Sequence, residues 1–448
     1  MAPAGTRLFG TDGVRGVANV ELTPHLALDL GRAAGSLLAN GPVVVGRDTR
    51  RSGEMLSMAV QAGFQSVGID TIDVGVMPSG GISHLTHHSS AEMGVIVSAS
   101  HNPAADNGVK FLDKLGSKLN DADEERIEAK VRTPGTSVTP IGGGVGTRLR
   151  MNDALDRYVA DLAKDAAYSF TGIDLTLDCA HGAAYQAAPA LFEALKADVE
   201  VIGASPTGLN INESCGATHP TVVAKAADGR IGLAFDGDAD RLIASDEKGR
   251  IVDGDRIMAI IARHWQRGGK LKNGIVVTTV MANLGFMRSM EQAGIEVVTT
   301  KVGDRYVLEA MHERKAMLGG EQSGHVIFLD RGRTGDGLLT GIRLLEVVAG
   351  TGRSLAELSD EAMVTYPQRL VNVRVERKER LDGASEIWSE VADVESELGA
   401  DGRVLIRASG TEPLVRVMVE ASRAADAERY AERLADSVRE ALGSGREE

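Results

Sequence analysis

Residues 43–75 read VVVGRDTRRSGEMLSMAVQAGFQSVGIDTIDVG: an apolar strand, a turn, a stretch of helical periodicity and a second short strand. This order predicts a βαβ unit. It recurs from Leu175 (LTLDCA, APALFEALKAD, VEVIG) and from Ile275 (IVVTTV, LGFMRSMEQAG, IEVVTT). Strands joined by helical crossovers pair mostly in parallel, because tight hairpins cannot connect them. The chain is therefore expected to be α/β, with three similar mixed α/β domains.

The last part of the chain follows a different pattern. LVNVRVER and RVLIRASGTEPLVRVMVEA alternate apolar and polar residues, which predicts strands, two of them flanking a polar loop. A long amphipathic helix is expected from about Ala424 to Leu442, so this fourth domain should be α+β. Pattern breaks at a Gly- and Pro-rich linker (132–148), at a turn (246–258) and near Pro367 predict domains 1–150, 151–252, 253–366 and 367–448.

Composition narrows the class of protein. A chain of 448 residues suits three or four domains, and a net charge of −14 without a Lys/Arg run argues against a nucleic-acid partner. No uninterrupted apolar stretch is long enough to span a bilayer, and the N-terminus lacks a signal-peptide pattern, so neither membrane insertion nor export is expected. Two cysteines, Cys179 and Cys215, fit a reducing compartment, and a cytoplasmic location is expected.

The segment VIVSASHNP is the first candidate site. Its apolar run predicts a buried strand that Pro103 ends, so residues 98–102 are expected to be exposed at a strand end, a usual place for chemistry in α/β proteins. A serine hydroxyl is a poor nucleophile without a base or a cation, so Ser100 alone indicates little. Serines that only satisfy the backbone of a turn remain an alternative, as does a purely structural His101.

The segment IGLAFDGDADR is the second candidate site. It places Asp236, Asp238 and Asp240 at alternate positions after an apolar strand, and extended geometry would turn all three carboxylates the same way. Three neighbouring carboxylates repel one another without a cation, and oxygen ligands favour Mg²⁺ or Ca²⁺ over zinc. A calcium EF-hand is disfavoured, because Arg241 stands where that loop needs glycine and a strand precedes it. A solvated acidic turn remains the other alternative.

Two further loops carry polar groups suited to a phosphorylated sugar. In GGEQSGH, side chains between glycines could bind sugar hydroxyl or amino groups, although a structural turn is an alternative; the candidates are Glu321, Ser323 and His325. In RASGTEP and just beyond, arginines, hydroxyls and backbone N–H groups suit a phosphate; the candidates are Arg407, Ser409, Gly410, Thr411 and Arg416. The four loops together fit phosphoryl transfer on a sugar phosphate.

The same loops carry a family resemblance. FGTDGVRG from Phe9, SASHNP from Ser98, DGDADR from Asp236, GEQSGH from Gly320 and RASGTEP from Arg407 occur in the order of the α-D-phosphohexomutase superfamily. The chain resembles that superfamily over essentially its whole length. TKVGDRYV (300–307), and glutamine in GEQSGH where phosphoglucomutase/phosphomannomutase relatives usually carry methionine, resemble the bacterial branch that acts on glucosamine phosphates.

The resemblance implies four domains around a central cleft and a resting enzyme phosphorylated on Ser100. Phospho-Ser100 would donate to glucosamine 6-phosphate, and the resulting 1,6-bisphosphate would reorient and return its 6-phosphoryl group, leaving glucosamine 1-phosphate for UDP-N-acetylglucosamine and cell-wall synthesis. One Mg²⁺ per chain would be held by Ser100, Asp236, Asp238 and Asp240. Glucosamine or glucose 1,6-bisphosphate would serve as activator, and a homodimer is an expectation of the resemblance alone.

The resemblance also suggests roles for side chains. Lys110, ten residues after Ser100, is the candidate for proton exchange, and a cationic or partly buried site could lower its pKa; a solvated lysine is the alternative. Arg15 is expected to stabilise charge in the phosphoserine loop, Arg241 to act beside the metal, and His101 to assist.

The sugar is assigned to Glu321, Ser323 and His325, and the non-reacting phosphate to the RASGTEP loop with Arg416. The fourth domain is expected to swing during reorientation of the intermediate. Alternatives are a phosphoglucomutase or phosphomannomutase, or a non-catalytic phosphosugar- or calcium-binding protein whose Asp loop is structural.

Overall fold

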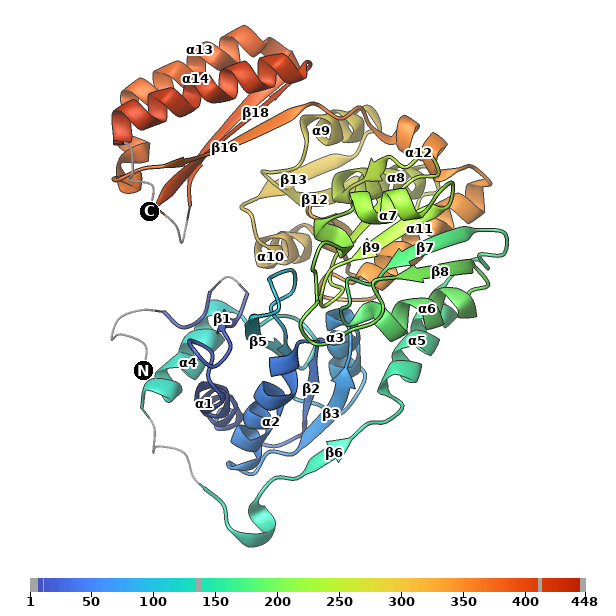
Figure 1. The fold of residues 1–448 in the computed structure, drawn as a ribbon, viewed down its shortest axis with the longest axis vertical. Helices are drawn as coiled ribbons and strands as arrows, with labels where there is room; N and C mark the ends of the chain where they lie inside the picture. Colours follow the sequence, from blue (N-terminus) through green and yellow to red (C-terminus); the bar gives the residue numbers. More distant parts are fainter. Residues whose placement is uncertain (1–6, 11, 134–138, 410–412, 444–448) are drawn as a thin grey trace. The chain divides into compact units, whose positions relative to one another are not determined.

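The computed structural model describes residues 7–10, 12–133, 139–409 and 413–443 (Figure 1). The chain divides into two compact units, residues 1–281 with 293–362, and residues 282–292 with 363–448. The first unit holds three sheets of parallel and antiparallel strands, and the second holds one antiparallel sheet. The predicted α/β class is confirmed, and the strands of each sheet come from one continuous part of the sequence.

The first sheet has the strand order β1-β5-β4-β2-β3-β6. The predicted βαβ unit is present: β2 and β3 pair in parallel, and α2 connects them. Helices α1 and α2 pack closely, because a Cβ on Gly31 would lie 2.1 Å from the Val60 carbonyl oxygen. The elements are β1 (Val14–Val17), α1 (Pro24–Gly35), β2 (Val43–Arg47), α2 (Arg51–Gln65), β3 (Thr71–Val76), α3 (Ser79–His87), β4 (Met93–Val97), β5 (Asp106–Asp113), α4 (Asp121–Arg132) and β6 (Arg148–Arg150).

The second sheet has the order β11-β10-β9-β7-β8. Its β7 and β8 pair in parallel across α6, as predicted, and β9 also runs parallel to β7. The carboxyl end of β9, where the loop with the three aspartates begins, therefore lies at the same edge of the sheet as the carboxyl end of β7. The elements are α5 (Ala154–Asp165), β7 (Asp174–Asp178), α6 (Ala184–Ala194), β8 (Asp198–Ile202), α7 (Thr221–Ala226), β9 (Ile231–Phe235), β10 (Leu242–Ser245) and β11 (Ile251–Val252).

The third sheet has the order β13-β12-β14-β15, and its predicted parallel pair of β12 and β13 is confirmed. Helix α11 is buried over most of its length, as its largely apolar sequence requires. The elements are α8 (Gly254–Arg267), β12 (Ile275–Thr279), β13 (Glu296–Thr300), α10 (Asp304–Arg314), β14 (Leu318–Gly320), β15 (Val326–Phe328), α11 (Gly337–Thr351) and α12 (Leu355–Ala362).

The second unit is an antiparallel sheet of order β16-β18-β17 with helices against it. The predicted helix Ala424–Leu442 and the strands on both sides of the polar loop are confirmed, whereas α13 was not expected. Helix α9 (Leu284–Gln292), which connects β12 to β13 in the chain, belongs to this unit. The remaining elements are β16 (Gln368–Arg374), α13 (Ser385–Leu398), β17 (Gly402–Ala408), β18 (Leu414–Ala421) and α14 (Ala424–Leu442).

Short 3₁₀ helices complete the described elements, at Gly142–Gly144, Gly216–Thr218, Lys272–Gly274, Lys378–Gly383 and Gly399–Asp401. Among the helices of the described ranges, none is both long enough and apolar enough to cross a membrane.

Candidate active site

The serine loop begins where β4 ends, as predicted, but it is not exposed. Only 1% of Ser100 is accessible, because other segments cover the loop. The buried Arg50 guanidinium donates hydrogen bonds to the carbonyl oxygens of Ser100 (2.9 Å) and Asn102 (2.7 Å), and the Asn212 amide donates to the Ser100 carbonyl at 2.9 Å. The predicted exposure of residues 98–102 is therefore wrong for residues 98–100, which are buried, while His101 and Asn102 are half-buried.

The hydroxyl of Ser98 also holds the loop. Ser98 Oγ donates to Asp48 Oδ2 at 2.6 Å and accepts from the Ser100 N–H at 2.9 Å. Burial raises the pKa of Asp48, and the ion pair with Arg50 opposes that rise. Ser100 itself has φ of 50°, a left-handed conformation that residues other than glycine rarely adopt. The surrounding hydrogen bonds thus fix the hydroxyl in a conformation that the backbone alone would not favour.

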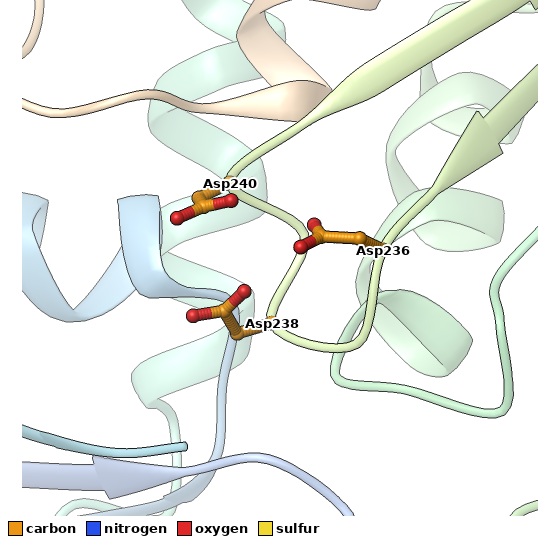
Figure 2. Close-up of side chains that lie close together, drawn as sticks. All are labelled: Asp236, Asp238 and Asp240. Carbon is orange, nitrogen blue, oxygen red and sulfur yellow. The ribbon is translucent and has the colours of Figure 1, made fainter. Parts of the chain in front are cut away.

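The three aspartates after β9 converge in space (Figure 2), with one carboxylate oxygen of each within 4.8 Å of the others. The extended geometry predicted for them is wrong. The loop turns, since the Ala239 N–H donates to the Asp236 carbonyl at 3.0 Å and Ala239 has φ of 57°. The turn, rather than strand alternation, brings the carboxylates together.

Electrostatics at this loop favour a bound cation. Burial, and then the charges of Asp240 and Asp238, raise the pKa of Asp236 well above its usual range; burial and Asp238 also raise that of Asp240. Burial acts the same way on Asp238, but the Lys110 ammonium outweighs it, so its pKa lies below the usual range. The Oδ1 atoms of Asp238 and Asp240 are buried with no hydrogen-bond partner among the described residues. Unpaired carboxylate oxygens of this kind fit a hard divalent cation.

The serine and the aspartates meet directly. Ser100 Oγ donates to Asp236 Oδ2 at 2.6 Å, and His101 Nδ1 lies 3.3 Å from the same hydroxyl oxygen. Burial, with the charges of Arg241 and Arg15, lowers the pKa of His101 to about 4, so its imidazole is neutral at pH 7. Two sites predicted from separate motifs therefore form one site.

Lys110 lies in the same site. Its Nζ is 2.9 Å from Asp12 Oδ2 and 3.1 Å from Asp238 Oδ2. Burial lowers the pKa of Lys110, but the charges of Asp12 and Asp238 outweigh burial, and the pKa lies above its usual range. The expected lowering is wrong because the surroundings of the ammonium are anionic rather than cationic.

Both predicted arginines reach this region. Arg15 pairs with the Asp12 carboxylate, and its guanidinium lies 3.4 Å from the Asn102 side-chain oxygen. The Arg241 N–H donates to Asp236 Oδ1 at 3.2 Å, and the Arg241 Nε lies 3.8 Å from Asp240 Oδ1. Positive charge thus borders both the serine loop and the aspartate turn.

The GEQSGH segment forms the connection of the β14–β15 hairpin. Glu321 accepts from the Gly303 N–H at 3.1 Å, and Ser323 is exposed. His325 is buried, accepts from the Gly335 N–H at 3.1 Å, and forms an isolated β-bridge with Arg241. The hairpin therefore lies beside the aspartate turn, with Glu321 and Ser323 at its tip.

In the second unit, Arg407 and Arg416 lie directly opposite each other on β17 and β18. Burial and the charge of Arg416 lower the pKa of Arg407. Like charges opposite one another on neighbouring strands are destabilising, and a bound anion would relieve the repulsion. Ser409 is buried at the end of β17, whereas Gly410 and Thr411 lie outside the described residues.

Sequence analysis missed several residues that hold the site together: Asp12, Asp48, Arg50, Lys118 and Asp304. Asp12 and Asp304 stand inside two of the motifs that carry the family resemblance, TDGVRG and TKVGDRYV. No pattern in the sequence singles out Asp48, Arg50 or Lys118. Asp48 and Arg50 pair with each other, but the serine loop that they hold, like the partners of Lys118, lies far away along the chain.

On an α/β scaffold of several sheets, a buried serine hydroxyl donates to one of three clustered carboxylates, an arrangement that suits an enzyme of phosphoryl transfer with a divalent cation. Three family models match the chain: phosphoglucomutase/phosphomannomutase alpha/beta/alpha domain I at residues 6–137, alpha/beta/alpha domain III at 253–366, and the C-terminal domain at 370–437. The chain belongs to the phosphoglucomutase/phosphomannomutase family.

Relatives narrow the comparison further. Phosphoglucosamine mutases of Lysinibacillus sphaericus and Shouchella clausii are each 49% identical to this chain. The matches cover 98% of this chain, and 99% and 100% of the two relatives, respectively. A phosphoglucomutase/phosphomannomutase family protein of Burkholderia thailandensis is similar in structure, with a TM-score of 0.82, 26% identity and 98% of each chain covered. The N-acetylphosphoglucosamine mutase of Aspergillus fumigatus, solved with GlcNAc-6P and magnesium, shares the fold at a TM-score of 0.72 and 20% identity, over 98% of this chain and 97% of its own.

Proposed function

We propose that the chain is a phosphoglucosamine mutase, which interconverts glucosamine 6-phosphate and glucosamine 1-phosphate through phospho-Ser100 and a 1,6-bisphosphate. The observation that carries the proposal is the 2.6 Å contact of Ser100 Oγ with Asp236 inside the aspartate cluster. Relatives that are 49% identical over nearly the whole chain and carry that name support the choice of sugar. The product would supply amino sugar for cell-wall precursors, in the cytoplasm.

Ser100 is the phosphoryl carrier of the proposal. Arg50 and Asn212 hold its carbonyl and Ser98 holds its N–H, so the Oγ keeps one direction while the phosphoryl group is transferred and recovered. Asp236, Asp238, Asp240 and a phosphoserine oxygen would hold Mg²⁺. When bound, the ion offsets negative charge on the transferring group.

Lys110 is the proposed proton-exchanging group. The sugar hydroxyl loses a proton as it attacks the phosphoryl group, and an oxygen regains one as it leaves. The Lys110 ammonium, held between Asp12 and Asp238, can donate its proton to the leaving oxygen, and the resulting amine can accept the proton that the attacking hydroxyl loses. Arg15 and Arg241 would stabilise charge on the moving group, with neutral His101 assisting at the hydroxyl.

Recognition of the substrate would use two loops. Glu321, Ser323 and His325 belong to the hairpin beside the aspartate turn and would bind the sugar. The non-reacting phosphate would bind the arginine pair of the second unit and its loop: Arg407, Ser409, Gly410, Thr411 and Arg416. Glucosamine or glucose 1,6-bisphosphate would act as activator, and a homodimer is proposed from the family alone.

A substrate panel tests the proposal. Purified protein with Mg²⁺ and glucose 1,6-bisphosphate is assayed on the 6-phosphates of glucosamine, glucose and mannose, and Ser100 phosphorylation is mapped by mass spectrometry. We expect the highest kcat/KM on glucosamine 6-phosphate, phosphate on the SASHNP peptide, and no turnover by a folded Ser100→Ala variant. A preference for glucose or mannose would instead indicate a phosphoglucomutase or phosphomannomutase. No turnover and no phosphate would indicate a binding protein.

A further inference from the structure

A second lysine, Lys118, lies behind Lys110 on the far side of Asp12. Asp12 uses its two carboxylate oxygens separately: Oδ1 contacts Lys118 Nζ, and Oδ2 lies 2.9 Å from Lys110 Nζ. Lys118 Nζ also contacts Asp304 at the start of α10, and only 14% of the Lys118 side chain is exposed. Asp304, Lys118, Asp12, Lys110 and Asp238 therefore form a continuous row of alternating charges.

The row constrains the Asp12 carboxylate. Arg15 shares Oδ2 with Lys110, so two cations lie at one oxygen of Asp12 and Lys118 lies at the other. Without Lys118, all cations at Asp12 would be on one side, and the carboxylate could rotate toward either of them. A side chain that neighbours hold on both sides keeps a single rotamer, whereas one held on a single side is free to swing. Lys118 thus decides where Asp12 presents Oδ2.

The position of Oδ2 in turn decides the position of the Lys110 ammonium. Lys110 has close anionic partners in Asp12 and Asp238, and its Nζ lies 4.0 Å from Asp240. If Asp12 turned away, the ammonium would move toward the aspartate turn and away from the direction that Asp12 now fixes. Lys118 has a further partner in Asp304, which lies 3.5 Å from His325, so the opposite explanation is that Lys118 only neutralises Asp304.

We propose that Lys118 is a positioning residue for Lys110 and acts through Asp12. The inference rests on the proposed function, in which Lys110 exchanges a proton with the sugar phosphate. Lys118 itself touches no reacting atom. Its contribution is the orientation of the Asp12 carboxylate, and through it the placement of the Lys110 ammonium.

Lys118→Met tests the proposal, with Lys114→Met as the matched control. Lys114 is exposed in the same β-turn region, so its replacement removes the same charge without touching Asp12. A displacement of about 1 Å in a catalytic group can cost on the order of 100-fold in rate, so we expect kcat to fall by roughly that factor in Lys118→Met, with phosphate still present on Ser100. KM for the sugar phosphate should stay within about threefold, since uniform binding is not removed. Lys114→Met should match wild type.

Three outcomes separate positioning from charge neutralisation. If Lys118 only compensates Asp304, Lys118→Met combined with Asp304→Asn recovers kcat, which overturns the proposal. The proposal expects kcat to stay low in that double variant, and expects Lys118→Met to add little to the loss in Asp12→Asn, because both act on one pathway. A Lys118→Met variant with kcat within about twofold of wild type also overturns it.

Two further choices keep the test decisive. Should Lys118→Met fail to fold, Lys118→Arg keeps the charge but alters its geometry; a lowered kcat supports positioning, and an unchanged kcat overturns it. Should wild type turn over glucose or mannose 6-phosphate rather than glucosamine 6-phosphate, the proposed sugar is wrong. The Lys118 comparison is then made on the accepted substrate and still decides the role of Lys118.

Discussion

Replacing the buried Arg50 by methionine should loosen the serine loop specifically. The guanidinium pairs with Asp48 and donates to the carbonyl oxygens of Ser100, Asn102, Pro103 and Asp106. Removing one partner of a buried ion pair costs about 3–5 kcal/mol, because the remaining charge stays buried and unpaired. Each 1.4 kcal/mol is roughly a factor of ten, so local opening should become about 100- to several-thousand-fold more frequent.

Hydrogen–deuterium exchange measured by mass spectrometry reads this change directly. Peptides covering residues 97–106 should exchange faster in Arg50→Met by that factor, whereas the β12 peptide should keep its wild-type rate. Arg51→Met is the matched control, since Arg51 is the exposed neighbour in the chain. Adding Asp48→Asn to Arg50→Met should recover part of the protection, because it removes the uncompensated charge. Wild-type exchange rates in Arg50→Met, or an equal acceleration in Arg51→Met, would refute the conclusion that the Arg50 guanidinium holds the serine loop.

Three other predictions concern charge. The raised pKa of Asp236 means that the folded, metal-free chain binds more protons than the unfolded one above about pH 4, so its stability falls as pH rises through that window. Asp236→Asn should flatten this fall and raise the thermal midpoint near neutral pH. If differential scanning fluorimetry gave the same dependence of the midpoint on pH in the variant, the raised pKa of Asp236 would be contradicted. Removing divalent cations with a chelator should lower turnover by roughly two orders of magnitude or more, and added Mg²⁺ should restore it, with the circular dichroism spectrum constant throughout. In thermal unfolding, inorganic phosphate at 100 times its Kd should stabilise the second unit by about 2.7 kcal/mol. Arg407→Met and Arg416→Met should each abolish this stabilisation, and Arg374→Met, which replaces an exposed arginine of β16, should preserve it. Loss of the stabilisation in Arg374→Met would argue for a non-specific effect of charge.

Local pattern was sufficient for the repeated units of the fold. Each predicted parallel pair is present, because two strands joined by a crossover helix within a short stretch of sequence pair in parallel whatever the rest of the chain does. The antiparallel insertion of β5 beside β4 and the helix α13 were not predicted. The place of β5 beside β4 depends on strand pairing that hydrophobic periodicity does not encode. The placement of α9 in the second unit depends on contacts with residues 363–448, which come much later in the chain.

At the site, motifs located the reacting groups but not their surroundings. The exposure of Ser100 was predicted wrongly because Arg50 and Asn212, which cover it, come from distant segments. The sign of the Lys110 pKa shift was predicted wrongly because it depends on which charges face the ammonium, and Asp12 lies about a hundred residues earlier. Residue type and spacing therefore predict the chemistry that a loop offers, whereas protonation and burial come from the tertiary neighbours.

The charges in this site argue that cation binding and phosphorylation of Ser100 depend on one another. Asp236 lies 2.6 Å from Ser100 Oγ, so a phosphoryl group on that oxygen would bring further negative charge against carboxylates whose pKa values are already raised. The nearby lysines are already engaged: Lys118 lies between Asp12 and Asp304, and Lys110 between Asp12 and Asp238. If Lys110 turned to the phosphoserine, the buried Asp238 would lose its ammonium partner, and if Lys118 did so, Asp304 would lose its own. A divalent ion at the Oδ1 atoms of Asp238 and Asp240, which lack hydrogen-bond partners among the described residues, would compensate that charge with no such loss, and would account for a hydroxyl placed against the aspartate cluster.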